Sequence, residues 1–138
     1  MRTFVAVIGA LVMLAGLTEI ILPQWTLSAA RGLYRIDPIL ISGFVAIAIG
    51  MELVAASVTR RVGLRTFVAV IGVIMAVFGL VCAIQPGWVR DLGHAAFLQQ
   101  PWGLQLLLLW ITGAVRILIG AGLIYAALRQ PMVTAPAQ

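Results

Sequence analysis

Three ionisable side chains lie inside long apolar runs, and their types favour proton transfer, ion coupling or substrate recognition within a membrane. They are Glu19, Glu52 and Arg116. Charged groups inside membrane spans are costly in free energy, so their presence indicates either a functional site or a buried structural pair. In the structural interpretation, one ion pair and one neutral glutamic acid fix the register of packed helices. Both interpretations depend on which helix faces carry the three side chains.

Helical spacing predicts that Glu19 and Arg116 form an intramembrane charge pair. Glu19 shares a helix face with Gly16, and Arg116 shares one with Thr112 and Gly113. Stripes of small residues let membrane helices approach closely, so both charged side chains should face the interior of the helix bundle. Since side chains lean toward the N-terminus of their helix, the two should converge.

Glu52 lies on a different face from the small residues of its own run and shares that face with Val45 and Ala48. Three interpretations remain open for its carboxyl group. It contacts a partner subunit, it is protonated and hydrogen-bonded, or it bonds Arg116 after a change in packing. The first makes Glu52 a candidate partner contact.

The residues of the common catalytic and cofactor sites are missing from this sequence. A single histidine, His94, excludes a bis-histidine haem within the chain, and the ligands for a metal site are too few. The single cysteine, Cys82, excludes an internal disulfide. No nucleotide-binding glycine motif occurs, and no base accompanies the serines. We therefore expect no enzymatic activity and no cofactor, and we interpret His94 as an interfacial residue rather than a pigment or haem ligand.

The composition is that of a membrane protein. Hydrophobic residues make up 63% of the 138 residues, charged residues only 9%, and the mean hydropathy is +1.14. So few charges cannot cover a water-exposed surface, which usually carries about 25% charged residues. All nine cationic residues are arginines spread along the chain rather than clustered, so we expect no nucleic-acid binding. The expected partners are membrane lipids and other transmembrane subunits.

Four apolar runs have the length of membrane-spanning helices. They cover residues 3–22, 38–58, 66–84 and 104–128, and about 20 residues cross the hydrocarbon core of a bilayer. Helices satisfy their own backbone groups in lipid. The prediction is an all-α polytopic membrane protein with four transmembrane helices.

An internal repeat organises these spans. The sequence RTFVAVIG occurs at residues 2–9 and again at 65–72, and thirteen of twenty-five positions are identical between residues 1–25 and 64–88. Six of ten positions match between residues 41–50 and 111–120. We interpret residues 1–63 and 64–130 as tandem transmembrane hairpins of the same orientation, related by an axis along the membrane normal, with residues 131–138 as a short tail.

The ends of the spans carry orientation signals. More arginines flank the termini and the middle loop than the other two loops, which predicts cytoplasmic N- and C-termini. Each half has a Pro-x-Trp sequence after its first span, which we expect to end that helix. Trp25, Trp88 and Trp102 are predicted anchors at the membrane interface.

Residues 89–103 mix charged, amide and large apolar side chains, which is typical of a segment lying in the membrane interface. This segment is either a surface connection or a docking surface. In the second interpretation His94, Phe97 and Trp102 join Glu52 as candidate partner contacts.

Each half, an apolar helix followed by Pro-x-Trp and then a glycine-rich helix, resembles small uncharacterised two-helix proteins of bacterial inner membranes. That resemblance implies a fold and a bacterial cytoplasmic membrane. Four spans, the short length and a glutamate in the first span are also similar to the small multidrug resistance exporters. Their key glutamate lies near the middle of the first span, whereas Glu19 lies near its outer end, and Arg116 would oppose a cationic substrate.

The sequence therefore favours a non-catalytic accessory or structural subunit of a larger bacterial membrane complex, such as a respiratory or photosynthetic one, that acts by helix packing. The alternative is a small homo-oligomeric transporter or channel that uses Glu19, Glu52 and Arg116.

Overall fold

The computed structural model describes residues 2–33, 35–59 and 64–129, and within these ranges all regular structure is helical. The first half contains the long helices α1 and α3 with the short helix α2 between them. The second half contains α4, α5, the π-helical turn η1 and α6. Their bounds are α1 Arg2–Ile21, α2 Pro23–Leu33, α3 Ile36–Val58, α4 Arg65–Ile84, α5 Pro86–Gly93, η1 His94–Leu98 and α6 Trp102–Leu128.

The four long helices α1, α3, α4 and α6 are long and apolar enough to cross a membrane. Their ends lie within two residues of the spans that the hydrophobic runs predict. The expectation of an all-α polytopic membrane protein is therefore confirmed. The four helices indicate a multi-pass membrane protein.

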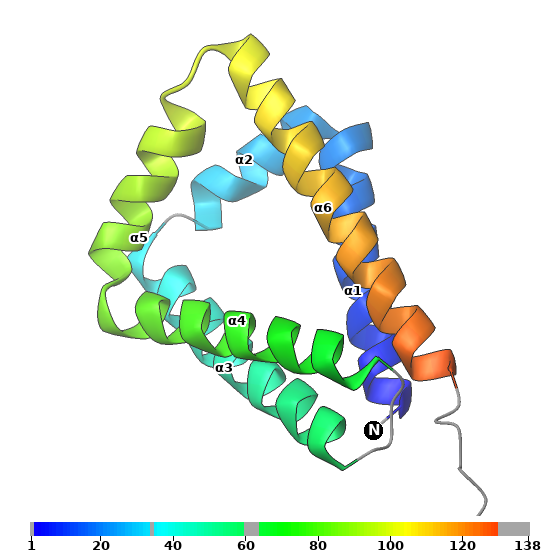
Figure 1. Cartoon of the computed structure of the whole chain (residues 1–138). Helices are drawn as coiled ribbons and strands as arrows, with labels where there is room; N and C mark the ends of the chain where they lie inside the picture. Colours follow the sequence, from blue (N-terminus) through cyan, green and yellow to red (C-terminus); the bar gives the residue numbers. More distant parts are fainter. Residues whose placement is uncertain (1, 34, 60–63, 130–138) are drawn as a thin grey trace, which may run out of the picture.

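The long helices form two antiparallel pairs, α1 with α6 and α3 with α4 (Figure 1). Both pairs pack backbone against backbone through glycines. A Cβ atom on Gly16 would lie 2.5 Å from the carbonyl oxygen of Gly113, and one on Gly79 would lie 2.5 Å from that of Gly43. About two helical turns along each helix, Gly9 contacts Gly120 in the first pair and Gly72 contacts Gly50 in the second. Only glycine permits this close approach.

Each long helix therefore packs along a helix from the other half of the chain. In the repeat, α1 corresponds to α4 and α3 corresponds to α6. The pairs α1–α6 and α4–α3 are thus corresponding pairs, and their glycine contacts fall at corresponding positions. Within one half, α1 and α3 touch at only a few residues.

The two pairs meet at one end of the molecule. Val5, Leu53, Val68 and Leu123 are fully buried there, and each comes from a different long helix. They form one apolar core together with neighbouring alanines and Ile8. Away from this core the pairs diverge, and α2 and α5 lie across the opening (Figure 1).

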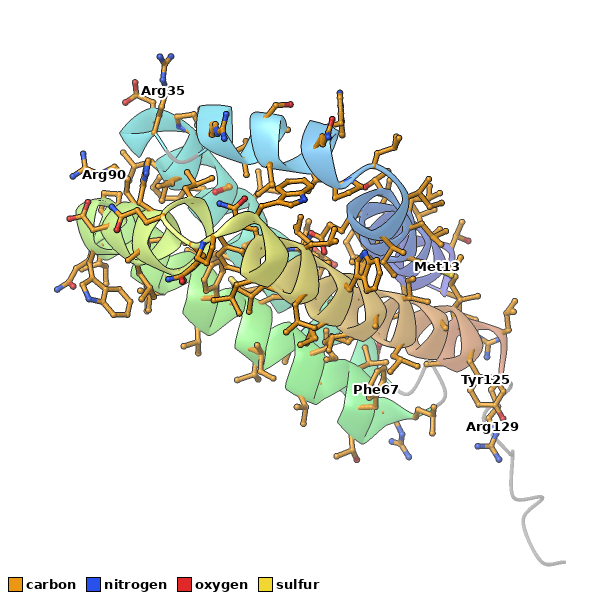
Figure 2. All side chains as sticks on the ribbon, turned by 90° about the horizontal axis from the view of Figure 1, so that it is seen from above. Met13, Arg35, Phe67, Arg90, Tyr125 and Arg129 are labelled. Atoms are coloured by element: carbon orange, nitrogen blue, oxygen red, sulfur yellow. The ribbon has the colours of Figure 1, made fainter. Side chains whose placement is uncertain are left out.

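The core lies near the end that carries Arg2, Arg65 and Arg129, called the arginine end below. Arg129 stacks over the ring of Tyr125, with its guanidinium carbon 5.8 Å from the ring centroid. In Figure 2, Arg35 and Arg90 lie at the opposite end of the molecule.

The two prolines of the Pro-x-Trp sequences begin helices, which the sequence analysis did not predict. α1 ends at Ile21 and α4 ends at Ile84, as expected, but α2 then starts at Pro23 and α5 at Pro86. The first position of a helix needs no backbone N–H, so proline fits it well. Residues 23–33 are consequently a helix rather than an irregular connection, and residues 86–98 are helical as well.

Candidate functional site

A cavity of about 440 Å³ lies between the two helix pairs, on the side away from the apolar core. Side chains from all seven helical elements line it. The cavity exists because the pairs contact each other closely only near the arginine end, while α2 and α5 with η1 extend across the space between them. It is thus a product of the whole fold rather than of one motif.

The α1–α6 wall of this cavity carries the predicted charge pair. Arg116 Nη1 donates a hydrogen bond to Glu19 Oε1, and the two side chains form a salt bridge. Thr112 Oγ1 lies 3.2 Å from Glu19 Oε2 and donates to it. The Glu19 side chain is 7% exposed and that of Arg116 is 49% exposed. The carboxylate is therefore enclosed by its partners, whereas the guanidinium keeps an open side.

The glycine contacts explain why these side chains meet. Gly16 and Gly113 bring the backbones of α1 and α6 together one turn from Glu19. Because the helices are antiparallel and side chains lean toward the N-terminus of their helix, Glu19 and Arg116 lean toward each other. The pair that helical spacing predicts is the pair that the structure joins.

The α3–α4 wall has no charge at the corresponding positions. The repeat aligns Glu19 with Cys82, Thr112 with Ser42 and Arg116 with Ala46. Cys82 and Ser42 line the same cavity from its other side. The cavity therefore has one charged wall and one nearly apolar wall.

Most hydroxyl groups of the lining bond backbone carbonyls of their own helix. Thr18 Oγ1 donates to the oxygen of Ala15 at 2.8 Å, and Ser42 Oγ donates to the oxygen of Ile39 at 2.9 Å. A guanidinium has five N–H donors, and within the described part of the chain Glu19 is the acceptor for Arg116. Arg116 is therefore the charged lining group with donor capacity left for another molecule.

Aromatic and aliphatic side chains supply the rest of the lining. Trp25, Phe78 and Phe97 reach the cavity from α2, α4 and η1. Among the described residues, no group of three His, Cys, Asp or Glu side chains is placed to hold a metal ion. The arrangement suits recognition of a molecule that is polar at one end and apolar along the rest.

The other predicted site residues lie elsewhere or at the rim. Glu52 is exposed on α3, outside the cavity lining, and makes no hydrogen bond or ion pair with any residue that the structure describes. His94 is half-buried at the start of η1, and Phe97 faces the cavity. Trp102 and Trp88 are exposed at the starts of α6 and α5.

Sequence reasoning missed the contribution of α2 to the cavity. Trp25, Ala29 and Leu33 follow each other at intervals of four residues and line the cavity from one face of this helix. That spacing is typical of a helix with one apolar face. It was a usable signal, because a proline at the first position is also typical of a helix start.

Comparisons of this chain with family models, curated proteins and solved structures give no match.

Proposed function

We propose that this protein is a non-catalytic accessory subunit of a larger bacterial membrane complex and acts by helix packing within the bilayer. The observation that carries this proposal is Glu52, an exposed carboxyl group on a membrane-spanning helix that has no partner among the described residues. The chain supplies the buried carboxyl of Glu19 with two hydrogen-bond donors. It leaves Glu52 to another molecule.

The position of Glu52 makes a second polypeptide the most suitable partner. It lies six residues before the end of α3 at Val58, which is about 9 Å along the helix axis. Lipid chains at that depth offer no hydrogen-bond donor, and an unpaired ionisable group there is costly. Val45 and Ala48 are exposed on the same face. A transmembrane helix that places a donor or a cation opposite Glu52 would satisfy it.

The proposal includes a bacterial cytoplasmic membrane, cytoplasmic termini and an origin by tandem duplication. Arg2, Arg65 and Arg129 at one end support the orientation through the bias of arginine toward the cytoplasm. The corresponding glycine contacts in the two helix pairs support the duplication. With this orientation, the apolar core lies toward the cytoplasmic side of the membrane and the cavity lies toward the opposite side.

The test is native mass spectrometry of the tagged chain after gentle extraction from its own membrane. We expect fixed-ratio association with one or more other membrane polypeptides. Glu52→Leu should abolish that association while leaving the unfolding of the chain alone unchanged, because Glu52 has no partner among the residues that the structure describes. Met51→Leu is the matched control, since Met51 is its exposed neighbour on α3. Persistence of the complex in Glu52→Leu, or a chain that runs alone, would contradict the proposal.

A small homo-oligomeric transporter is the second candidate, and the cavity with Glu19 and Arg116 favours it. A wild-type chain that forms a dimer or higher homo-oligomer in native mass spectrometry would support this candidate. In that case Glu19→Gln and Arg116→Ala should each abolish proton-coupled uptake into proteoliposomes. Unaltered uptake in both variants would exclude a role of this pair in coupling.

A further inference from the structure

We propose that the cavity between the helix pairs binds a single-chain amphiphile with an anionic headgroup, a carboxylate or a phosphate, whose oxygens bond Arg116. Its hydrocarbon chain lies against the apolar α3–α4 wall. This site is separate from Glu52 and does not depend on the accessory-subunit function. A chain that binds no partner can still bind the amphiphile.

Arg116 sets the chemistry of the headgroup. Its side chain is 49% exposed and faces a lined cavity in the middle of a membrane-spanning helix. One donor, on Nη1, is used by Glu19. The planar guanidinium matches carboxylate and phosphate oxygens with two parallel hydrogen bonds, and these are stronger than bonds between neutral groups. An anionic headgroup supplies the acceptors that the remaining N–H donors lack.

The volume and lining of the cavity determine the chemistry of the rest of the ligand. A volume of about 440 Å³ lies within the range of roughly 300–1,000 Å³ that small-molecule sites occupy. Phe78, Cys82 and Ile39 line the side opposite the charge pair. Since Ser42 on this wall already donates to a backbone oxygen, the wall offers little to a polar substituent. An apolar chain is the complementary shape and chemistry.

Glu19 competes with the ligand for the guanidinium. Among the described residues, Glu19 and Arg116 are the only Asp, Glu, Arg or His side chains that line the cavity. An anion that enters therefore meets a pair that is already neutral, and the Glu19 carboxylate repels it. Replacing Glu19 with glutamine removes that repulsion while keeping an acceptor for Thr112. The affinity for the anion should then rise.

Trp25 provides a local probe of occupancy. It is the only one of the four tryptophans that lines the cavity. The repeat supplies a matched control, because Trp88 occupies the corresponding position in the second half, is similarly exposed, and lies outside the lining. One full-length chain keeps only Trp25, with Trp88, Trp102 and Trp110 changed to phenylalanine. A second keeps only Trp88.

The experiment measures quenching of tryptophan fluorescence in phosphatidylcholine nanodiscs by dibrominated stearate, at a pH at which its carboxylate is ionised. Brominated lysophosphatidate forms the phosphate arm, and the uncharged brominated monoglyceride is the control probe. We expect saturable quenching of Trp25 by one or both anions, and only the weak, non-saturable quenching of simple partition at Trp88. Binding of one anion alone identifies the headgroup.

In the Trp25 chain, Arg116→Gln should weaken anion binding by about tenfold or more, since a charge-assisted hydrogen-bonded pair is lost. Arg116→Lys should retain part of the affinity, and Glu19→Gln should increase it. Circular dichroism checks that each variant folds. Competition by unbrominated stearate in the Trp25 chain with Arg116 and Glu19 unchanged gives a second measure of binding that needs no variant at Arg116. Equal quenching of Trp25 by the monoglyceride, equal quenching of Trp25 and Trp88, or no competition by stearate would overturn the proposal.

Discussion

The two helix pairs share one packing arrangement and differ in charge. In α1–α6, a Cβ on Gly120 would lie 2.5 Å from a carbonyl oxygen of the facing helix, and in α3–α4 one on Gly50 would lie 2.6 Å from such an oxygen. Beside these matching contacts, the first pair carries a salt bridge and the second carries none among its described residues. The same glycine frame therefore forms with the charges and without them.

That difference indicates that close packing of the helices and the charge pair are independent features of the fold. α3 and α4 pack closely with Ser42, Ala46 and Cys82 at the positions where α1 and α6 have Thr112, Arg116 and Glu19. Because the uncharged set supports the same close approach, packing does not require the ion pair. Buried ion pairs seldom add net stability relative to apolar residues of similar size. The anionic ligand that we propose for Arg116 would account for the charge pair.

The largest expected effect comes from breaking the shared glycine contacts. Gly16→Val and Gly79→Val place side chains against the carbonyl oxygens of Gly113 and Gly43, and each should lower the free energy of unfolding by about 3 kcal/mol, the upper end of the overpacking range. The two losses should be similar. Detergent-titration unfolding followed by circular dichroism measures them, with Gly103→Val, which has no atom within 4 Å of its added Cβ, as the control. A large loss at only one of the two sites would show that the pairs do not share their packing.

An intermediate effect should follow from removing the cation alone. Arg116→Met leaves the enclosed Glu19 carboxyl without its charged partner, so we expect a loss of about 2 kcal/mol, the lower part of the range for hydrogen bonds to charged groups because Arg116 is half exposed. Leu118→Met, on the exposed face of the same helix, should change little. The same unfolding titration applies. No loss in Arg116→Met would mean that Glu19 has other adequate partners.

The smallest difference should separate the two corresponding hydroxyl groups. Thr112 Oγ1 lies within hydrogen-bond distance of the Glu19 carboxylate as well as of backbone oxygens of its own helix, whereas Ser42 Oγ bonds a backbone oxygen alone. Thr112→Val should therefore cost about 1 kcal/mol, and Ser42→Ala should stay within about 0.5 kcal/mol of the wild type. Thr112→Ser, which keeps the donor, should restore most of the loss. Equal costs at Thr112 and Ser42 would remove the asymmetry that the contacts indicate.

Much of this arrangement could be predicted from the sequence, because its signals are local and periodic. Long apolar runs identify the four spans, and helical spacing places Glu19 and Arg116 on glycine-bearing faces. Two side chains on facing glycine stripes have few other partners in lipid. The charge pair could therefore be predicted from the sequence alone.

The pairing of each long helix with a helix from the other half of the chain could not be predicted in the same way. Since α1 and α4 carry nearly the same stripe, and α3 and α6 do as well, the sequence is compatible with pairing within a half or across halves. The cavity depends on that choice, because it forms only between pairs that meet at one end. The role of α2 was missed for a simpler reason, in that Pro23 was interpreted as a helix end and not also as a helix start.

The most direct test gives α1–α6 the uncharged residues of α3–α4. In the chain with Trp25 as its only tryptophan, Glu19→Cys, Thr112→Ser and Arg116→Ala are combined, and both unfolding and quenching by brominated stearate are measured. We predict a free energy of unfolding within about 1 kcal/mol of the parent chain and loss of the saturable quenching of Trp25. A triple variant that unfolds as readily as Arg116→Met, or that still binds stearate with the parent affinity, would contradict the account that the glycines build this fold and the charges serve its cavity.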